Sequence, residues 1–418
     1  MRELLNYLLF VESSTSILHL IVCSFNAYMP YVGPDGALSA SKYAYVGGFD
    51  GTSNVLAGKL TGVAISGTHA HAYVMTYTGL HEITDSTIKT PEGGSVEFLK
   101  LVTQIREELG YSCTNNGELA AFISYAMAFP AGTLCLVDTY DTLQSGILNY
   151  ICVACALLLV GYIPRGIRLD SGDLSYLSRA ARSVFHAVDA SIASEDQSQH
   201  PALLKLQQIF AMNTASGWRL ANSTIVASND INEEVLVSLS REGHEIDCFG
   251  IGTHLVTCQK QPALGCVYKL VEINGTPRIK LSQEVEKLVI PCSKNAYRLY
   301  GKDGQPLNDF MTSTNEPAPE VGVRLLCRHP FAENLRAYVT PSRVETLLQL
   351  TFDGPNGFAA PIESLEVARD RCRAQLKSIR NDVVRTLNPT PYKVSTSLHL
   401  FDYMHKLWLE EAPVADLS

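Results

Sequence analysis

The sequence has few of the features that mark secreted, membrane or nucleic-acid-binding proteins. It contains no internal repeat and no low-complexity tract, and acidic residues outnumber basic ones, which gives a formal net charge of −9 at pH 7. This balance argues against a general nucleic-acid binder and leaves no polybasic signal for a membrane surface. A site for a phosphorylated ligand must therefore be local, and must be built from backbone amides and a few basic side chains.

The 11 cysteines lack the spacing of a disulfide framework. Their number is odd, and several, such as Cys135, Cys152 and Cys155, lie in apolar runs, which indicates a reducing compartment. Cys152 and Cys155 form a CxxC inside the apolar run 147–160, without flanking charge. This context favours a buried helix over a redox or metal site.

The N-terminal residues 1–32 are apolar but lack an uninterrupted hydrophobic run. Glu12 and a Ser/Thr cluster break the stretch well short of the roughly 20 residues that a membrane span requires. Arg2 is offset by Glu3, so the positive region of a signal peptide is weak. We therefore expect neither secretion nor a membrane anchor from this segment.

Five short apolar stretches between residues 63 and 253 each end in polar or glycine-containing turns, and most lead into a helical pattern. The predicted strands are residues 63–66, 133–137, 166–169, 224–227 and 246–249. Such alternation is typical of parallel strands with helices outside them. A doubly wound open sheet has a similar sequence pattern. Its polar residues gather at one switch point, however, whereas here every predicted strand has a polar ending, which favours an α/β barrel.

After about residue 256 the pattern becomes β-rich. Two hairpins are predicted, one over residues 265–281 and one around residues 296–304, followed by helices over 366–382 and 398–410. The stretch 189–222 is expected to be a surface excursion. The expected organisation is an atypical apolar segment (1–32), an α/β barrel carrying the active-site motifs (33–255), and a β-rich second domain with a helical tail (256–418).

The strand endings carry charged side chains suited to a metal and an anion. Arg168 and Asp170 flank one strand end, where the carboxylate suits ribose hydroxyls or Mg²⁺ and the guanidinium suits an anion. The alternative is an Arg–Asp ion pair at the barrel rim. Asp138 and Asp141 suit Mg²⁺–pyrophosphate, and the alternative for them is a helix N-cap and a first-turn acid.

Two histidines follow the first predicted strand. His71 is a candidate nucleophile toward ATP or a general acid–base. His69 points to the opposite face if the strand continues, so we expect only one of the two to face a ligand. Residues 249–253 form a turn that either binds an anion such as phosphate through its backbone N–H groups or is only a tight turn. Taken together, the polar residues at the strand ends indicate a site that binds a phosphorylated sugar with Mg²⁺.

The sequence resembles the nicotinate phosphoribosyltransferases through ordered motifs spread over roughly residues 33–418. The motifs are residues 47–58, 66–71, 136–141, 166–174, 227–230, 249–253, 261–270 and 387–394. That family joins nicotinate to phosphoribosyl pyrophosphate, giving nicotinate mononucleotide and pyrophosphate with coupled ATP hydrolysis, in NAD biosynthesis. The resemblance implies the type II phosphoribosyltransferase fold, an irregular α/β barrel with a second α/β sandwich domain, and a cytosolic homodimer.

The resemblance also implies roles for individual residues. His71 matches the family's phosphorylated histidine, with Arg168 and Asp170 on the nicotinate and ribose side. Asp138 matches a Mg²⁺–pyrophosphate position, and Asp141 is kept beside it as the second candidate metal ligand from the residue pattern. The implied substrate-binding residues are Thr68, Ser171, Asn229, Gly250, Gly252 and Thr253. Mg²⁺ is the expected cofactor and ATP the expected co-substrate, and no nucleic-acid or membrane partner is expected.

The resemblance does not extend to residues 1–31. The family begins with a long segment that supplies a ring-stacking Tyr and part of the sandwich domain, and residues 1–31 resemble none of it. We therefore expect a partial sandwich domain. An alternative to the active enzyme is a truncated, inactive remnant that binds phosphoribosyl pyrophosphate or ATP, or pairs with a full-length subunit.

Overall fold

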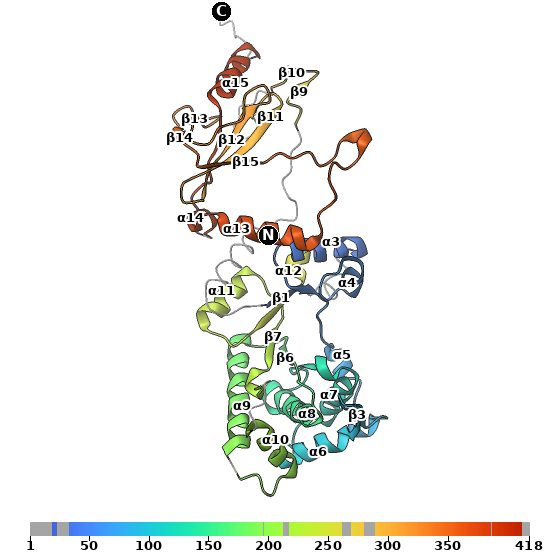
Figure 1. Cartoon of the computed structure of the whole chain (residues 1–418). Helices are drawn as coiled ribbons and strands as arrows, with labels where there is room; N and C mark the ends of the chain where they lie inside the picture. Colours follow the sequence, from blue (N-terminus) through green and yellow to red (C-terminus); the bar gives the residue numbers. More distant parts are fainter. Residues whose placement is uncertain are drawn as a thin grey trace, which may run out of the picture. The chain divides into compact units, whose positions relative to one another are not determined.

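A computed structural model describes residues 19–22, 33–194, 196–211, 217–260, 269–279, 289–385 and 387–411. The chain divides into two compact units, residues 1–262 and 263–418, each drawn in Figure 1. The sequence pattern places this boundary between residues 255 and 256.

The first unit is built on a six-stranded sheet in the order β2-β1-β8-β7-β6-β5. Every pairing in it is parallel. The strands are β1 (His19–Val22), β2 (Gly51–Thr52), β5 (Leu134–Leu136), β6 (Gly166–Leu169), β7 (Thr224–Ala227) and β8 (Cys248–Ile251). This cyclic order, in which β8 is followed by β1 and β2, is that of a barrel, whereas a doubly wound sheet reverses direction at a switch point. The described strands form an open half-barrel with edges at β2 and β5.

Helices connect and cover these strands (Figure 1). The helices of this unit are α3 (Gly33–Val46), α4 (Val55–Thr61), α5 (His71–Val74), α6 (Phe98–Glu108), α7 (Asn116–Ala128), α8 (Ile147–Val160), α9 (Leu174–Ser194), α10 (Pro201–Ala211), α11 (Glu233–Glu242) and α12 (Thr253–Val256). A small hairpin, β3 (Thr87–Lys89) and β4 (Ser95–Glu97), precedes α6. Asparagine side chains cap three helices, with Asn54 at α4, Asn115 at α7 and Asn232 at α11.

Helix α8 is the centre of the hydrophobic core. By length and composition, residues 142–160 are the one described stretch apolar enough to cross a membrane, but most of it is buried inside the unit. The helix packs against α6, α7 and α10. Cys152 and Cys155 are completely buried in it, which confirms that this CxxC belongs to a core helix.

A π-helical turn, Thr142–Gly146, leads from the end of β5 into α8. A Cβ atom on Gly146 would lie 1.8 Å from the carbonyl oxygen of Val137. Only glycine therefore allows the turn to approach β5 this closely. The close approach places α8 directly behind the polar residues that follow β5.

Two expectations about this unit were wrong. The predicted strand 63–66 makes only a single bridge, between Ile65 and Thr52, because two-residue β2 offers no longer partner. The stretch 189–222 is not merely a surface excursion, because it contains α10, which buries Ala202, Leu203, Leu206 and Phe210. In addition, residues 19–22 form a strand of the sheet, which the sequence pattern of the N-terminal segment did not indicate.

The second unit contains a six-stranded mixed sheet in the order β14-β13-β16-β12-β11-β15. Its strands are β11 (Lys294–Tyr300), β12 (Pro306–Ser313), β13 (Leu325–Arg328), β14 (Arg336–Val339), β15 (Arg343–Thr346) and β16 (Val394–Thr396). Helix α15 (Leu398–Glu411) packs against β12 and β13, as the layers of an α/β sandwich do. A small core forms around Tyr297, Leu299, Phe310 and Cys327.

The predicted elements of this unit are partly confirmed. The hairpin β11–β12 is present, and α15 covers the predicted helix 398–410. Of the first predicted hairpin, the described residues 269–279 contain β9 (Glu272–Ile273) and β10 (Thr276–Pro277), and residues 265–268 and 280–281 lie outside the described residues. The predicted helix 366–382 is divided into α13 (Leu365–Ser378) and α14 (Asn381–Val384).

Candidate active site

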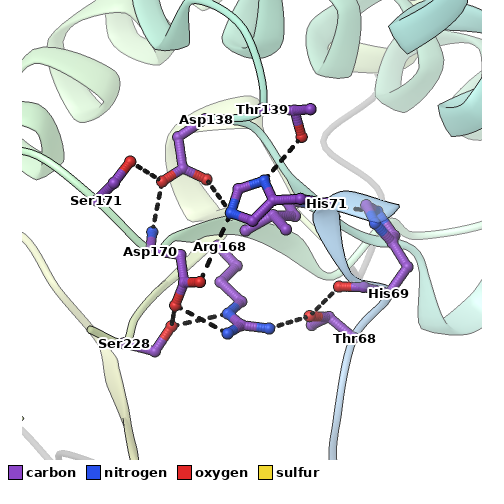
Figure 2. Close-up of polar contacts among 10 residues, drawn as sticks. Thr68, His69, His71, Asp138, Thr139, Arg168, Asp170, Ser171 and Ser228 are labelled. Atoms are coloured by element: carbon purple, nitrogen blue, oxygen red, sulfur yellow. Dashed lines mark hydrogen bonds and ion pairs between the residues drawn. The ribbon is translucent and has the colours of Figure 1, made fainter. Parts of the chain in front are cut away.

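Polar side chains meet at the carboxyl ends of β5, β6 and β7 and at the start of α5 (Figure 2). Asp138 follows β5, Asp170 follows β6 and Ser228 follows β7, while His71 is the first residue of α5. Because parallel strands end at the same rim of a barrel, residues that are distant in the sequence come together there. We call His71, Asp138, Arg168 and Asp170 the rim cluster.

Asp138 is the most buried member of the rim cluster, with its side chain 2% exposed. Its Oδ2 accepts hydrogen bonds from the backbone amide of Asp170 at 2.9 Å and from Ser171 Oγ at 2.5 Å. Its Oδ1 is buried and has no hydrogen-bond donor among the described residues. A buried carboxylate oxygen without a partner is costly, so this atom is suited to a cation.

His71 faces both carboxylates of the rim cluster (Figure 2). Its Nδ1 lies 3.0 Å from Thr139 Oγ1. Its Nε2 lies 3.6 Å from Asp170 Oδ2 and 3.9 Å from Asp138 Oδ1. The side chain is 38% exposed and so is accessible to a ligand. Thr139 had no role in the sequence prediction, and the only signal for it is a hydroxyl directly after Asp138.

Arg168 donates one hydrogen bond from each of its three guanidinium nitrogens and so joins three segments. Its Nε donates to Ser228 Oγ at 2.8 Å, Nη1 to Thr68 Oγ1 at 3.1 Å, and Nη2 to Asp170 Oδ1 at 2.8 Å. Ser228 Oγ also donates to the same oxygen of Asp170. The alternative reading of an Arg–Asp ion pair at the rim is therefore correct as a contact, but the pair belongs to a larger network.

His69 does not face the rim cluster. Its ring packs against Tyr73, Phe122 and Tyr125, with centroids 5.4, 5.9 and 4.7 Å away. Burial lowers its pKa from 6.5 to about 4, so the ring is neutral near pH 7. The two histidines thus lie in different surroundings, with His71 on the polar side, and the expectation that only one of them faces a ligand stays a prediction.

Asp141 occupies the position expected of a helix N-cap. Its Oδ1 accepts hydrogen bonds from the amides of Leu143 and Gln144, at 3.0 and 2.7 Å, in the π-helical turn. Its carboxylate is not among the hydrogen-bond partners of Asp138 or Asp170. Its role as a metal ligand stays a prediction.

The remaining predicted substrate residues lie on the next strand endings. Asn229, after β7, has a φ of 121°, a conformation that L residues rarely adopt. Gly250 lies within β8, Gly252 precedes α12, and Thr253 begins it. These residues share the rim with the rim cluster, and their phosphate-binding role also stays a prediction.

Glu118 was missed as a supporting residue. It lies on α7, is completely buried, and accepts hydrogen bonds from Ser145 Oγ at 2.5 Å and Asn149 Nδ2 at 3.0 Å. Burial, and then the negative charges of Asp138 and Asp141, raise its pKa from 4.5 to about 7. Through these hydrogen bonds Glu118 holds the turn that contains Ser145, behind Asp138. Its only signal in the sequence is a single acidic residue in an apolar helix.

The cyclic parallel half-barrel with acidic, basic and hydroxyl side chains at its strand ends defines a type II phosphoribosyltransferase fold. The solved structure of human nicotinic acid phosphoribosyltransferase matches it with a TM-score of 0.77 and 34% identity, covering 96% of this chain and 73% of the human chain. Residues 293–404 match the nicotinate phosphoribosyltransferase C-terminal domain.

Curated relatives extend the match over nearly the whole sequence. Nicotinate phosphoribosyltransferase 2 of Arabidopsis thaliana is 51% identical over 397 residues, which are 92% of this chain and 67% of the plant protein. Nicotinate phosphoribosyltransferase of Dictyostelium discoideum is 47% identical over 393 residues, or 92% of this chain and 63% of that protein. The chain therefore belongs to the nicotinate phosphoribosyltransferase family, and it spans about two thirds of the length of these relatives.

Proposed function

We propose that this protein forms nicotinate mononucleotide and pyrophosphate from nicotinate and phosphoribosyl pyrophosphate, with coupled ATP hydrolysis. Membership of the family supports this step of NAD biosynthesis. The observation that carries the assignment to the rim cluster is the position of His71 Nε2, 3.6 and 3.9 Å from two carboxylates at adjacent strand ends.

His71 is the proposed acceptor of the ATP γ-phosphoryl group. A tautomer in which Nδ1–H donates to Thr139 Oγ1 leaves a lone pair on Nε2, on a side chain that is 38% exposed. Attack of that lone pair on the γ-phosphorus forms an N–P bond, breaks the bond to the bridging oxygen, and releases ADP. Hydrolysis of the phosphohistidine then returns free His71 and phosphate, which makes the forward reaction more favourable.

Arg168 and Asp170 are the proposed contacts for nicotinate and ribose. Arg168 uses three N–H groups on protein atoms, and a guanidinium has five, so two remain for an anionic group such as the nicotinate carboxylate. Asp170 is held through Oδ1 by Arg168 and Ser228, and its Oδ2, 3.6 Å from His71 Nε2, accepts no hydrogen bond from the described residues and is the proposed acceptor for a ribose hydroxyl. The ring nitrogen of nicotinate attacks the anomeric carbon as its bond to pyrophosphate breaks, and these contacts orient the two reactants.

Mg²⁺ is the proposed cofactor, and the rim cluster fits it. Asp138 Oδ1 is buried without a donor among the described residues, and Asp170 supplies a second carboxylate nearby. The described residues offer no cluster of three or more His, Cys, Asp or Glu side chains for a metal, but Mg²⁺ commonly binds one or two carboxylates together with substrate phosphates. When bound, the ion supplies positive charge that stabilises the leaving pyrophosphate.

We further propose that the protein acts in the cytosol as a homodimer, without a membrane or nucleic-acid partner. Nine cysteines lie in the described part of the chain, and none of them forms a disulfide there, which suits a reducing compartment. The net charge of −9 disfavours polyanion binding. Light scattering of the purified protein measures the oligomeric state directly.

The test is a turnover assay with nicotinate, phosphoribosyl pyrophosphate, Mg²⁺ and γ-³²P-ATP. We expect formation of nicotinate mononucleotide that ATP stimulates, together with an acid-labile, base-stable ³²P label on His71. Absence of the mononucleotide at high enzyme concentration contradicts the proposal. Labelling without turnover would instead support the inactive remnant that binds its substrates.

A further inference from the structure

Among the described residues, the sheet of the half-barrel ends at β2 on one side and at β5 on the other, and one loop runs between these two edge strands. Residues 64–66 pair with the edge strand β2, through Thr52 N to Ala64 O at 2.9 Å and Ser66 N to Thr52 O at 3.0 Å. The same loop then approaches the other edge strand, β5. There, the backbone amide of Leu136 donates to His69 Nε2 at 3.3 Å. The loop is thus held to β2 by its backbone and to β5 by one side chain.

The Leu136 amide faces the open edge of β5. The next amide, that of Val137, donates to the carbonyl of Arg168 on the neighbouring segment. Successive amides of a strand point in opposite directions, so the Leu136 amide points away from β6. A buried amide left without an acceptor is costly, and His69 supplies that acceptor.

The surroundings of His69 fix it as an acceptor. A backbone amide can only donate, so Nε2 must carry the lone pair and Nδ1 the proton. The aromatic rings of Tyr73, Phe122 and Tyr125 surround the imidazole and keep it neutral. Its Nδ1 is buried and has no partner among the described residues. The hydrogen bond that Nε2 accepts therefore comes from β5.

The contact between His69 and Leu136 sets the register of the rim cluster. His71 lies two residues after His69, and Asp138 lies two residues after Leu136. Two residues beyond the first contact, His71 Nε2 lies 3.9 Å from Asp138 Oδ1, and His71 Nδ1 lies 3.0 Å from Thr139 Oγ1. The two chain segments therefore advance together, as two paired strands would, although no backbone pairing between them is recorded in the described residues.

We propose that His69 is a positioning residue that supplies, at β5, an acceptor where the described residues provide no second strand, and thereby sets His71 against Asp138 and Thr139. It contacts no substrate, and it acts through the loop. This inference rests on the proposed function of His71 as the phosphoryl acceptor. The anchoring of β5 itself does not depend on that function, which allows the two to be tested separately.

The decisive variants separate the acceptor from the ring. His69→Phe keeps an aromatic ring but removes the acceptor, and His69→Gln keeps an acceptor at a similar reach but removes the ring. Tyr125→Phe is the matched control, because it alters the same aromatic cluster and leaves the acceptor in place. Two readouts are measured on the full chain, amide hydrogen exchange by mass spectrometry over residues 134–137 and ³²P labelling from γ-³²P-ATP.

We expect His69→Phe to speed exchange in residues 134–137 and to slow labelling roughly tenfold or more, because small misplacements of a reacting group have large effects on rate. We expect His69→Gln and Tyr125→Phe to stay near the wild type in both readouts. Wild-type exchange and labelling in folded His69→Phe would overturn the inference. If His69→Phe does not fold, the folded His69→Gln variant decides. Faster exchange in residues 134–137 together with loss of labelling in that variant would overturn the inference equally, because it keeps the acceptor. If the wild type is never labelled, the proposed function fails, and hydrogen exchange still decides whether His69 anchors β5.

Discussion

The carboxylate of Asp138 accepts a 2.9 Å hydrogen bond from the backbone amide of Asp170. This bond joins the ends of β5 and β6 and holds two acidic residues side by side at the rim. Two neighbouring carboxylates repel one another, so their arrangement is stable only with compensating positive charge. Arg168 supplies part of that charge to Asp170, whereas Asp138 Oδ1 has no donor among the described residues.

Asp138→Asn is expected to weaken the response to Mg²⁺. The amide is similar in shape but has no negative charge, so the concentration of Mg²⁺ for half-maximal activity should rise by about tenfold or more. Initial rates measured across a magnesium titration check this. Ser171→Ala, which removes only one hydrogen bond to Asp138, is expected to have a smaller effect. An unchanged magnesium response in Asp138→Asn would show that the ion binds elsewhere.

Arg168→Lys is expected to impair nicotinate use. An ammonium group cannot reach Thr68, Asp170 and Ser228 at once, because it lacks the planar fork of the guanidinium. Loss of charge-assisted hydrogen bonds of roughly 2–3 kcal/mol corresponds to a fall of about a hundredfold in kcat/KM for nicotinate. Steady-state kinetics measures it. Arg182→Lys, at an ion pair with Asp247, should alter stability only, so equal kinetic losses in both variants would contradict the role of Arg168.

His71→Asn is expected to uncouple the enzyme from ATP. The variant has no ring nitrogen that can accept a phosphoryl group, so the acid-labile label should disappear and ATP should no longer stimulate the transfer. Some transfer should persist without ATP, since Arg168 and Asp170 remain. Parallel assays with and without ATP give both values. A label that survives in His71→Asn would place the phosphoryl acceptor at another residue.

Glu118 is expected to make stability fall as pH rises. Because its folded pKa of about 7 is above the ordinary 4.5, the folded state binds more protons than the unfolded state between these values. Stability therefore decreases through that window, and the full penalty, at most about 3 kcal/mol, is present above pH 7. Glu118→Gln should gain stability relative to the wild type on going from pH 5 to pH 8, as measured by urea unfolding.

A control separates this charge effect from the hydrogen bonds of Glu118. Ser145→Ala removes one donor to the carboxylate but leaves the acid in place. Its stability should still fall between pH 5 and pH 8, as in the wild type. If Glu118→Gln shows the same difference from the wild type at both pH values, the buried carboxyl is not the group that titrates.

Asn229→Gly is expected to stabilise the protein. The φ of 121° at this position is strained for any residue with a Cβ, and its relief should contribute about 1 kcal/mol. Urea unfolding measures it. Asn274→Gly is the comparison, because its φ of 50° is one that asparagine tolerates well. A gain at Asn274 as large as that at Asn229 would argue that strain at the rim is absent.

The sequence was most informative where a signal was local. Strands β5, β6 and β7 were predictable because each is a short apolar run that ends in a polar turn. Strand β8 begins two residues later than predicted and includes Gly250 and Ile251. The cap at Asp141 was among the alternatives. Strand β1 was not predictable, because the apolar run around His19–Val22 suits a strand or a helix and its partners lie far along the chain. The proposed role of His69 was likewise hidden, because it depends on β5 being an edge strand of the described sheet, which only the fold creates.

The place of β1 between β2 and β8 has a consequence for synthesis on the ribosome. Residues 51–52 follow soon after residues 19–22, but the other neighbour, residues 248–251, is made much later. Until then one edge of β1 is open to pairing with other chains. Strands β5 to β8 can assemble in order as they emerge, so the joining of β8 to β1 is expected to be a late, slow step of folding. Newly made chains are therefore most exposed to aggregation in the interval before residue 251 emerges.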